Sequence, residues 1–467
     1  MKAKLLFCYS LVAALAALAM PDLLLAANVL VVNKIQDSSD GSCDVADCSL
    51  REAMAAAQLG DSIEFSALFS SPQTIVLNGT NLVFSSNVTL RGPGRDLLTI
   101  SGNQQSRIFL IPFNYSVAIS DLSIRNGFTT GSGGGISATG HLDLRNATIS
   151  QNRANEFGSG ILAEGSYNIS NATISENQSQ LNGAICICGD SSGFIRDSII
   201  VNNIAARDGG GIYVESGTLT LISSTVGANS AARWGGGIYS FFSVVNVYES
   251  TITGNTANGP NTASGLDNTG GTVEVRNSTF SGNTIASDSI TGGALWTGGT
   301  ARITSSTFTE NSAPAGAFSA SGIYHSSGTL TIRNSIVAGN SHVGGAKDVT
   351  SSAPESLTSQ GYNLIGDSGS LVFNAIFDQV GSSASPLNPM LLPLANNGGP
   401  TLTHAPQTNS PILDRGFSFA LTSDQRGSRR PEDDLNIPNA SDGADIGAYE
   451  AFNDIIFKNG FDEPGLK

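Results

Sequence analysis

An asparagine that recurs at nearly constant spacing is the feature that most restricts how this chain can fold. Successive members of this column are separated by 25 to 29 residues. A second column, of isoleucine or leucine that usually follows glycine or alanine, keeps the same period. Two columns in step indicate a repeat architecture, in which each repeat contacts mainly its neighbours. The asparagines are Asn126, Asn152, Asn177, Asn203, Asn229, Asn255, Asn283, Asn311 and Asn340, and the apolar column is Ile136, Ile161, Ile185, Ile212, Ile238, Leu266, Leu295 and Ile323.

Apolar and polar residues alternate within each repeat, as in the segments 218–221 and 272–275. A period of two is that of a β-strand and not of a helix. A unit of about 26 residues with three short strands and tight turns fits one coil of a parallel β-solenoid, whose coils stack about 4.8 Å apart. The leucine-rich repeat has an overlapping period, but its dense leucine signature is absent. We therefore expect an all-β parallel β-helix over residues 75–340.

The asparagine and glycine columns have structural interpretations. Stacked coils place equivalent residues above one another, so an asparagine at one turn position can form a ladder of side-chain amide hydrogen bonds. Glycines beside the apolar column fit a positive φ or a close backbone approach at a corner between strands. We therefore do not count either column among the candidate functional residues.

The two ends of a solenoid need covers, because open strand edges promote aggregation. Residues 28–74 are the expected N-terminal cap. In it, Ser49 and Glu52 have the spacing of a capping box, and Leu50, Ala53, Met54 and Ala57 form one apolar face of a helix over 50–58. After Asn340 the period is lost, and proline, asparagine and glycine become frequent from 353 to 431. Residues 341–452 are therefore expected to form an irregular C-terminal cap, followed by a tail over 453–467.

The first residues have the pattern of a secretory signal. Two lysines precede an apolar run, and small residues follow it near Ala27. We expect residues 1–27 to be cleaved and the protein to be exported, with no transmembrane segment in the mature chain. In an oxidising compartment, Cys43 and Cys48 are the expected disulfide. Cys186 and Cys188 alternate along a strand and are either a structural pair or two free thiols.

Composition and charge exclude several classes of protein. The formal net charge of -15 opposes binding to nucleic acid. A charged fraction of 13% is too low for a coiled coil, and a hydrophobic fraction of 40% is too high for a disordered chain. The sequence has no phosphate loop with lysine and no Cys/His metal spacing. We expect no metal and no cofactor.

Several motifs resemble those of bacterial exported proteins. Segment 48–53, Cys-Ser-Leu-Arg-Glu-Ala, resembles the motif that names the CSLREA domain. The repeats resemble those of polymorphic outer membrane proteins, with Gly-Gly-Gly-Ile at 209–212, Gly-Gly-Ala-Leu at 292–295, and Phe-x-x-Asn at 280–283 and 308–311. Segments 389–401, 410–414, 424–427 and 445–450 are similar to the choice-of-anchor Q domain. This resemblance implies a right-handed parallel β-helix exported to the bacterial surface or surroundings, and it implies no particular reaction.

One face of the predicted helix concentrates aromatic residues. If the apolar column points inward, the residue one place later points outward. That outward column includes Tyr213, Tyr239, Trp296 and Tyr324. These side chains could form a platform on which sugar rings stack. The competing interpretation is that neighbouring aromatic residues stabilise each other by cross-strand packing.

The same face offers carboxylates for a possible reaction. Glu164 and Glu215 are two coils apart, about 9.6 Å by strand spacing, and Asp267 lies two coils further along. This separation is near the upper limit for an inverting glycosidase pair. Any acidic protein with outward-pointing aspartate and glutamate side chains also offers such pairs. These three residues are nevertheless the candidate catalytic residues.

Three functional hypotheses follow. The first is a secreted or cell-surface protein that binds a polysaccharide or a host cell-surface ligand without catalysis. The second is a polysaccharide lyase or glycoside hydrolase, which rests only on the use of such scaffolds by these enzymes. The third is a purely structural surface protein.

Overall fold

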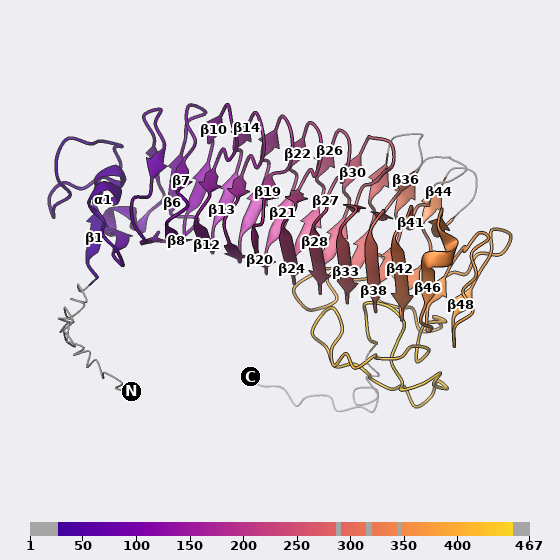
Figure 1. Ribbon diagram of the computed structural model, residues 1–467. Helices are drawn as coiled ribbons and strands as arrows, with labels where there is room; N and C mark the ends of the chain where they lie inside the picture. The colour runs from indigo at the N-terminus through magenta and orange to yellow at the C-terminus, as the bar shows by residue number, and fades with distance from the viewer. Residues whose placement is uncertain (1–26, 286–290, 314–319, 343–346, 452–467) are drawn as a thin grey trace, which may run out of the picture.

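The computed structural model describes residues 27–285, 291–313, 320–342 and 347–451, and these form a rod of stacked coils (Figure 1). The predicted signal peptide, apart from Ala27, and the predicted tail over 453–467 lie outside the described residues. All strand pairings in the four large sheets are parallel and join each coil to the next. The prediction of an all-β parallel β-helix is therefore confirmed.

Each regular coil passes through sheets C, A, B and D in that order. Three of these sheets correspond to the three predicted strands, and sheet D adds a fourth strand of only two residues. In one such coil the strands are β23 (Ile212–Glu215), β24 (Thr218–Ile222), β25 (Thr225–Gly227) and β26 (Ser230–Ala231).

The strands of sheet A are β1 (Val29–Val32), β2 (Ser62–Phe65), β5 (Thr89–Arg91), β8 (Ser116–Ser120), β12 (His141–Arg145), β16 (Tyr167–Ser170), β20 (Ser192–Arg196), β24, β28 (Val244–Tyr248), β33 (Thr272–Arg276), β38 (Thr300–Thr304), β42 (Thr329–Arg333) and β46 (Leu357–Ser359). Those of sheet B are β3 (Gln73–Val76), β6 (Leu98–Ser101), β9 (Ser123–Arg125), β13 (Thr148–Ser150), β17 (Thr173–Ser175), β21 (Ile199–Val201), β25, β29 (Thr251–Thr253), β34 (Thr279–Ser281), β39 (Thr307–Thr309), β43 (Ile336–Val337), β47 (Leu364–Ile365) and β48 (Gln379–Val380).

The strands of sheet C are β4 (Leu82–Val83), β7 (Phe109–Ile111), β11 (Ile136–Ala138), β15 (Ile161–Ala163), β19 (Ile185–Cys188), β23, β27 (Ile238–Phe241), β32 (Leu266–Thr269), β37 (Leu295–Thr297), β41 (Ile323–His325) and β45 (Val349–Ser351). Those of sheet D are β10 (Phe128–Thr129), β14 (Arg153–Ala154), β18 (Gln178–Ser179), β22 (Ile204–Ala205), β26, β30 (Thr256–Ala257), β35 (Thr284–Ile285), β40 (Ser312–Ala313) and β44 (Ser341–His342). A small fifth sheet pairs β31 (Thr262–Ala263) with β36 (Thr291–Gly292).

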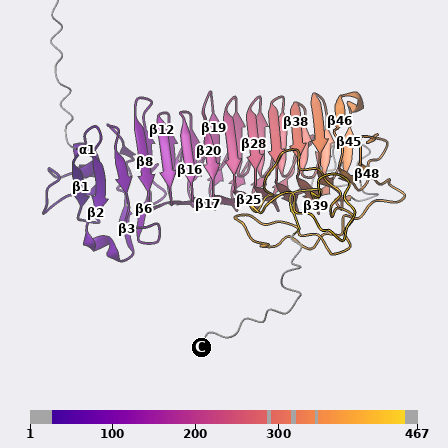
Figure 2. The ribbon, with the colours of Figure 1, turned by 90° about the horizontal axis from the view of Figure 1, so that it is seen from below.

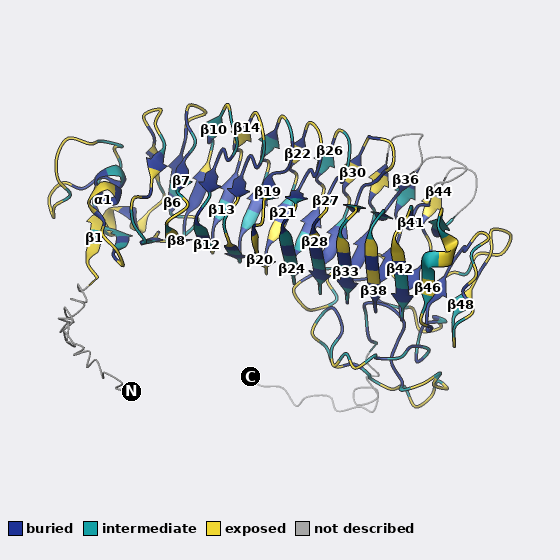
Figure 3. Ribbon diagram, viewed as in Figure 1, coloured by how far each residue is buried: buried dark blue, intermediate teal, exposed yellow. Residues whose placement is uncertain are grey.

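The core fills the inside of the rod with the inward members of each strand. In the coil that begins at β23, the inward side chains of Ile212, Val214, Leu219, Leu221 and Val226 are all 0% exposed. Full burial of each such side chain stabilises the fold by about 1.5–3 kcal/mol. Exposed residues gather in the loops at the N-terminal end and in the segment after β48 (Figure 3). The alternation seen in the sequence therefore corresponds to the inside and outside of the rod.

The asparagine column forms a ladder at the turn from sheet B to sheet D. The Nδ2 group of Asn203 donates to Oδ1 of Asn229 at 2.9 Å and to the carbonyl oxygen of Ile174 at 3.0 Å. The same pattern runs from Asn152 to Asn340. At the last rung, Asn340 donates to the carboxylate of Asp348, whose pKa is raised to about 6 by burial. This predicted ladder is confirmed for these eight residues.

Asn126 is the exception among the predicted ladder residues. Arg125 pairs with Ser150, so Asn126 aligns with Gln151 and has the same left-handed conformation, with φ of 56° against 58°. Gly127 occupies the ladder position, and its N–H donates to Oδ1 of Asn152. The prediction that Asn126 belongs to the ladder was wrong. In this coil the asparagine of the repeat lies one residue before the ladder position, which Gly127 occupies.

A second ladder, of serines, lies at the turn from sheet A to sheet B and was not predicted. Each backbone N–H donates to the hydroxyl of the next serine at 3.1–3.3 Å, and each hydroxyl donates to the carbonyl two residues before it. The members are Ser198, Ser224, Ser250, Ser278, Ser306 and Ser335. Both ladders satisfy turn groups that strands cannot pair.

The N-terminal cap contains the predicted helix and disulfide. Helix α1 (Leu50–Ala56) begins with the full capping box between Ser49 and Glu52, and the four predicted apolar residues are all buried. Cys43 and Cys48 are joined by a disulfide. A short 3-10 helix, η1 (Ala67–Ser70), follows. Strands β1 and β2 already belong to sheet A, so the stacked strands begin before residue 75.

The segment after residue 340 does not act as a simple end cap. A second 3-10 helix, η2 (Pro354–Ser356), and strands β45 to β48 first extend the solenoid. Residues 381–451 then turn back and lie along the outer face of sheet B (Figure 2). The contacts include hydrogen bonds from Thr251 to Leu402, from Thr279 to Gln425 and from Ala448 to Thr307. The predicted cap over 341–452 therefore covers a side of the rod.

Three of the motifs found in the sequence meet inside this segment. The N–H of Asp414, in 410–414, donates to Asp445, in 445–450. The N–H of Glu450 donates to Asp424, which begins 424–427. Burial raises the pKa of Asp445, and the adjacent Glu450 raises it further. These residues hold the segment together and attach it to the rod, which gives the motifs a structural role.

Candidate functional site

The predicted aromatic column lies on the outer face of sheet C. Cys186, Tyr213, Tyr239, Asp267 and Trp296 align on successive strands, in that order, and Tyr324 follows Trp296. Tyr213, Tyr239 and Tyr324 are only 6%, 2% and 4% exposed, and Trp296 is half-buried. A flat exposed platform of these four residues is therefore not formed.

The turns that lead from sheet D into sheet C cover the tyrosines. Phe157 stacks on Tyr213 with ring centroids 6.2 Å apart, and Trp234 lies 5.6 Å from Tyr239. The two tyrosines also stack on each other at 5.6 Å. Burial raises the pKa of both phenols. The competing interpretation of cross-strand packing therefore describes Tyr213 and Tyr239 better.

The most exposed ring of this aromatic cluster, that of Phe242, lies at the turn from sheet C to sheet A, which we call the C–A corner. Phe241 is half-buried and stacks on Tyr239 at 6.4 Å. Phe242 meets Phe241 edge to face at 4.6 Å and is 62% exposed. Glu215 and Thr269 flank Phe241 on the neighbouring strands. The corner therefore presents aromatic rings beside hydrogen-bonding side chains.

Sequence reasoning missed Phe157, Trp234 and Phe242, because they lie in turns outside the repeated columns. The Arg233 guanidinium stacks on Trp234 at 3.8 Å and forms a salt bridge of 2.6 Å with Asp208. This pair holds the covering turn in place. The position of Trp234 immediately before Gly-Gly-Gly-Ile at 235–238 was the available signal.

Asp267 interrupts the aromatic column between Tyr239 and Trp296. Its Oδ1 accepts a hydrogen bond from the hydroxyl of Thr269 at 3.1 Å, and the side chain is 1% exposed. Burial raises the pKa of this carboxyl to about 7. Tyr324 lies beyond Trp296, and its hydroxyl is 2.6 Å from that of Ser352. The column is thus two separate aromatic groups with a buried acid between them.

The raised pKa of Asp267 predicts a measurable change of stability with pH. The carboxyl is protonated in both states well below its ordinary pKa of 3.8. As the pH rises, the unfolded chain ionises first, so the native state loses stability until the pH exceeds about 7. We expect Asp267→Asn to remove this loss, which is about 4 kcal/mol for a shift of this size. Thermal unfolding of both proteins between about pH 4 and pH 8 measures the difference. A constant difference across this range would contradict the prediction.

The candidate carboxylates are not assembled into a catalytic pair. Glu164 is exposed at the C–A corner, whereas Glu215 is half-buried and accepts a hydrogen bond from the Tyr213 hydroxyl at 3.2 Å. Cys188 lies on the strand between them and is bonded to Cys186. Asp267 points outward from a different, buried column. Of the two possibilities for Cys186 and Cys188, the structure contains the structural pair.

An acidic cluster near the N-terminus already holds a cation of the chain itself. Asp40, Asp47 and Glu52 bring their carboxylate oxygens within 4.8 Å of one another. The ammonium group of Lys34 contacts all three. Burial would raise the pKa of Glu52, but hydrogen bonds from the backbone of Ser49 and Asp40 lower it to about 2. We assign this cluster to the cap.

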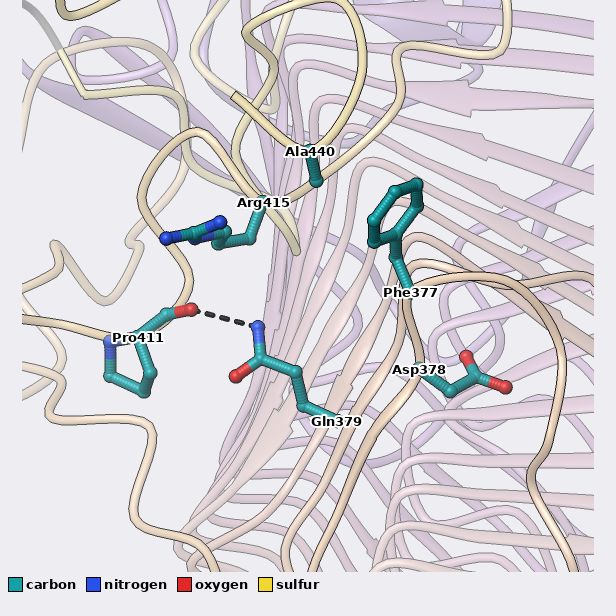
Figure 4. A pocket seen from close by; sticks show the side chains of 6 residues that line it. All are labelled: Phe377, Asp378, Gln379, Pro411, Arg415 and Ala440. Carbon is teal, nitrogen blue, oxygen red and sulfur yellow. Dashed lines mark hydrogen bonds between the residues drawn. The ribbon is translucent and has the colours of Figure 1, made fainter. Parts of the chain in front are cut away.

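The described surface includes several shallow pockets. One of about 420 Å³ lies where the C-terminal segment meets β48, between Phe377, Pro411, Arg415 and Ala440 (Figure 4). Its Gln379 amide donates to the carbonyl of Pro411 at 2.8 Å, which ties the two walls together. The other two, of about 290 Å³ each, adjoin at the C–A corner and share His141.

Comparison with known proteins gives limited matches. A repeat family described as the Chlamydia polymorphic membrane protein repeat matches residues 197–215. No curated protein matches the chain significantly. The crystal structure of the pectate lyase Pel9A aligns with a TM-score of 0.44 and 12% sequence identity, over 91% of this chain and 96% of that chain. The repeat match supports a resemblance of segment 197–215 to polymorphic membrane protein repeats, and the CSLREA and choice-of-anchor Q resemblances stay predictions.

No helix among the described residues is both long and apolar enough to span a membrane. Cleavage of the signal peptide and export of the protein remain predictions from the sequence.

Proposed function

We propose that this protein is an exported, surface-associated β-helix that binds glycans at the C–A corner without cleaving them. The observation that carries the proposal is the pair Phe241 and Phe242. Both rings are accessible, and they rest on Tyr239 and the buried rings behind it. Aromatic rings held on a rigid support offer contact area at low entropic cost, as sugar binding requires.

The neighbouring polar groups suit such a ligand. Glu215 can accept hydrogen bonds from sugar hydroxyls, and Thr269 can both donate and accept. These residues lie on the strands that flank Phe241. A stacked sugar would therefore find hydrogen-bonding partners on both sides. The short match to the polymorphic membrane protein repeat supports a surface role.

Phe242→Ala is expected to weaken glycan binding by about two- to twelvefold, because one aromatic contact contributes about 0.5–1.5 kcal/mol. A panel of neutral and acidic polysaccharides, first screened by retention on immobilised polymer, supplies the ligand for titration. Val372→Ala is the matched control, because Val372 is also exposed, at 74%, but lies near β48. Unchanged affinity of Phe242→Ala for every retained glycan would refute the proposal.

The alternative of polysaccharide cleavage has a direct test on the same panel. Incubation with the folded protein, with and without calcium, should release no new reducing or unsaturated ends. Release of such ends would replace the proposal by the lyase or hydrolase hypothesis. Glu215→Gln and Asp267→Asn would then show whether either carboxyl takes part.

A further inference from the structure

The C–A corner changes height along the rod because its turns differ in length. Four residues, 112–115, connect β7 to β8, whereas only two, Thr139 and Gly140, connect β11 to β12. The longer turn stands above its neighbour, and its Phe113 is 81% exposed. The connection from Ile187 to Gly193 is again longer, by two residues, than the aligned connection from Ala163 to Tyr167 in the preceding coil. The low coils between these turns form a notch in the corner.

Two adjoining pockets fill this notch and continue onto sheet A. One is lined by residues 113–115 of the longer turn together with Asn87, His141 and Ser166. The other lies over the small side chain of Ala118, which has Thr89 and Asp143 as its neighbours on the adjacent strands. Small residues in the middle strand and larger ones beside it therefore explain the hollow.

The side chains of His141 and Asn87 beside the notch are held in place by hydrogen bonds, and each has a further nitrogen that can bond to a ligand. Nδ1 of His141 is 2.7 Å from the hydroxyl of Ser166, and Oδ1 of Asn87 accepts a hydrogen bond from the N–H of Ser116 at 2.9 Å. His141 Nε2 and Asn87 Nδ2 make no hydrogen bond with any other described residue. Both groups remain available to a ligand.

The chemistry of the notch selects among ligand classes. The described residues that line the two pockets include no lysine or arginine, so a phosphate or a uronic acid would find no countercharge. Asp143, which is paired with Arg145 at 2.6 Å, is the lining carboxylate. Hydroxyl, amide and imidazole groups beside the rings of Phe113 and Tyr115 fit a neutral ligand with many hydroxyls.

We propose that this notch is a subsite for a neutral oligosaccharide, and that the same chain extends along the corner to Phe242. Five coil steps separate the turn of Phe113 from that of Phe242, which is about 24 Å by strand spacing. This inference rests on the proposed glycan binding and specifies its ligand as a neutral, linear oligosaccharide. Phe113 stacks on one sugar ring, while His141 and Asn87 bind its hydroxyls.

The test measures affinity for neutral gluco-, xylo-, manno- and chito-oligosaccharides, each as the disaccharide and as a longer oligomer. We expect the longer oligomer of the preferred series to bind at least tenfold more tightly than the disaccharide. The double variant Phe113→Ala/His141→Gln is expected to remove most of this length-dependent gain. Leu435→Ala is the matched control, because Leu435 is 85% exposed and lies in the C-terminal segment.

A second readout reports the notch directly. His141 is the histidine that lines these pockets, whereas His325 and His404 are buried. Its imidazole proton resonance, assigned with His141→Gln, should shift when the longer oligomer is added and stay unchanged with acidic oligogalacturonide. Loss of binding in Phe242→Ala with full binding in the double variant would overturn the subsite and leave the proposed function intact. Failure of all neutral oligomers to bind, with retention of acidic ones, would overturn the subsite alone. Failure of every glycan would overturn both.

Discussion

Replacing Arg430 with methionine should lower the free energy of unfolding by about 3–5 kcal/mol, the cost of leaving a buried charge without its partner. The Arg430 side chain is 0% exposed, and its Nε donates to Oε2 of Glu450 at 2.7 Å. Its other nitrogens donate to Oδ1 of Asn277 and to the carbonyl of Gly447. One side chain thus joins the C-terminal segment to itself and to the rod.

Arg430→Met should also release one segment of the protein before the rest unfolds. Without Arg430, residues 381–451 should leave the face of sheet B before the coils unfold, because the coils have their own continuous core. Chemical unfolding gives the free energy, and limited proteolysis of the native protein reports the release of the segment. Arg429→Met is the matched control, since Arg429 is exposed and adjacent in sequence.

A double variant distinguishes the cost of the unpaired Glu450 carboxylate from the loss of the other contacts of Arg430. Adding Glu450→Gln to Arg430→Met removes the unpaired carboxylate and should recover part of the lost stability. Equal unfolding free energies for Arg430→Met and Arg429→Met would show that the buried pair does not hold the segment.

The inside of the rod was predictable because local patterns determine it. The inward positions Ile212, Leu219 and Leu221 follow from a period of two within a repeat of constant length. The N-terminal helix was equally readable, since the capping box at Ser49 and Glu52 and the disulfide between Cys43 and Cys48 depend on close sequence neighbours.

The outside of sheet C was not predictable from the same columns. Period-two logic places Tyr213 and Tyr239 outward correctly, but outward is not the same as exposed. Whether they meet solvent depends on Phe157 and Trp234, which lie in turns with no repeating position. The accessible aromatic rings are therefore those of Phe241 and Phe242, a few residues after the predicted Tyr239.

The position of the C-terminal segment depends on contacts that have no local signature. Gln425 bonds to Thr279, which is 146 residues away, and His404 bonds to Ser281, 123 residues away. The aspartate, glutamine and arginine motifs were visible in the sequence, but their partners were threonines and serines that look like ordinary strand residues. The sequence of the C-terminal segment alone, or of the coils alone, does not reveal where the segment packs on the rod.

Asn229→Ala should lower the free energy of unfolding by about 3–5 kcal/mol, because it breaks the middle of the asparagine ladder. Asn229 Nδ2 donates to Oδ1 of Asn255 and to the carbonyl of Ile200, and its own Oδ1 accepts from the N–H and Nδ2 of Asn203. Each buried group left without a partner costs about 1–3 kcal/mol. A water molecule in the cavity left by the substitution would make some of these hydrogen bonds. The total loss of stability is therefore smaller than the sum of the separate costs.

Asn126 supplies the control that distinguishes a ladder from a sequence pattern. Both asparagines belong to the same periodic column, but Asn126 lies one place outside the ladder and has a positive φ of 56°. Asn126→Gly keeps that backbone conformation accessible and should change stability by less than about 1 kcal/mol. Denaturant titrations of both variants give the two values. A large loss in both would mean that spacing alone, without the structural register, identifies the stabilising asparagines, and a small loss in both would remove the ladder as a source of stability.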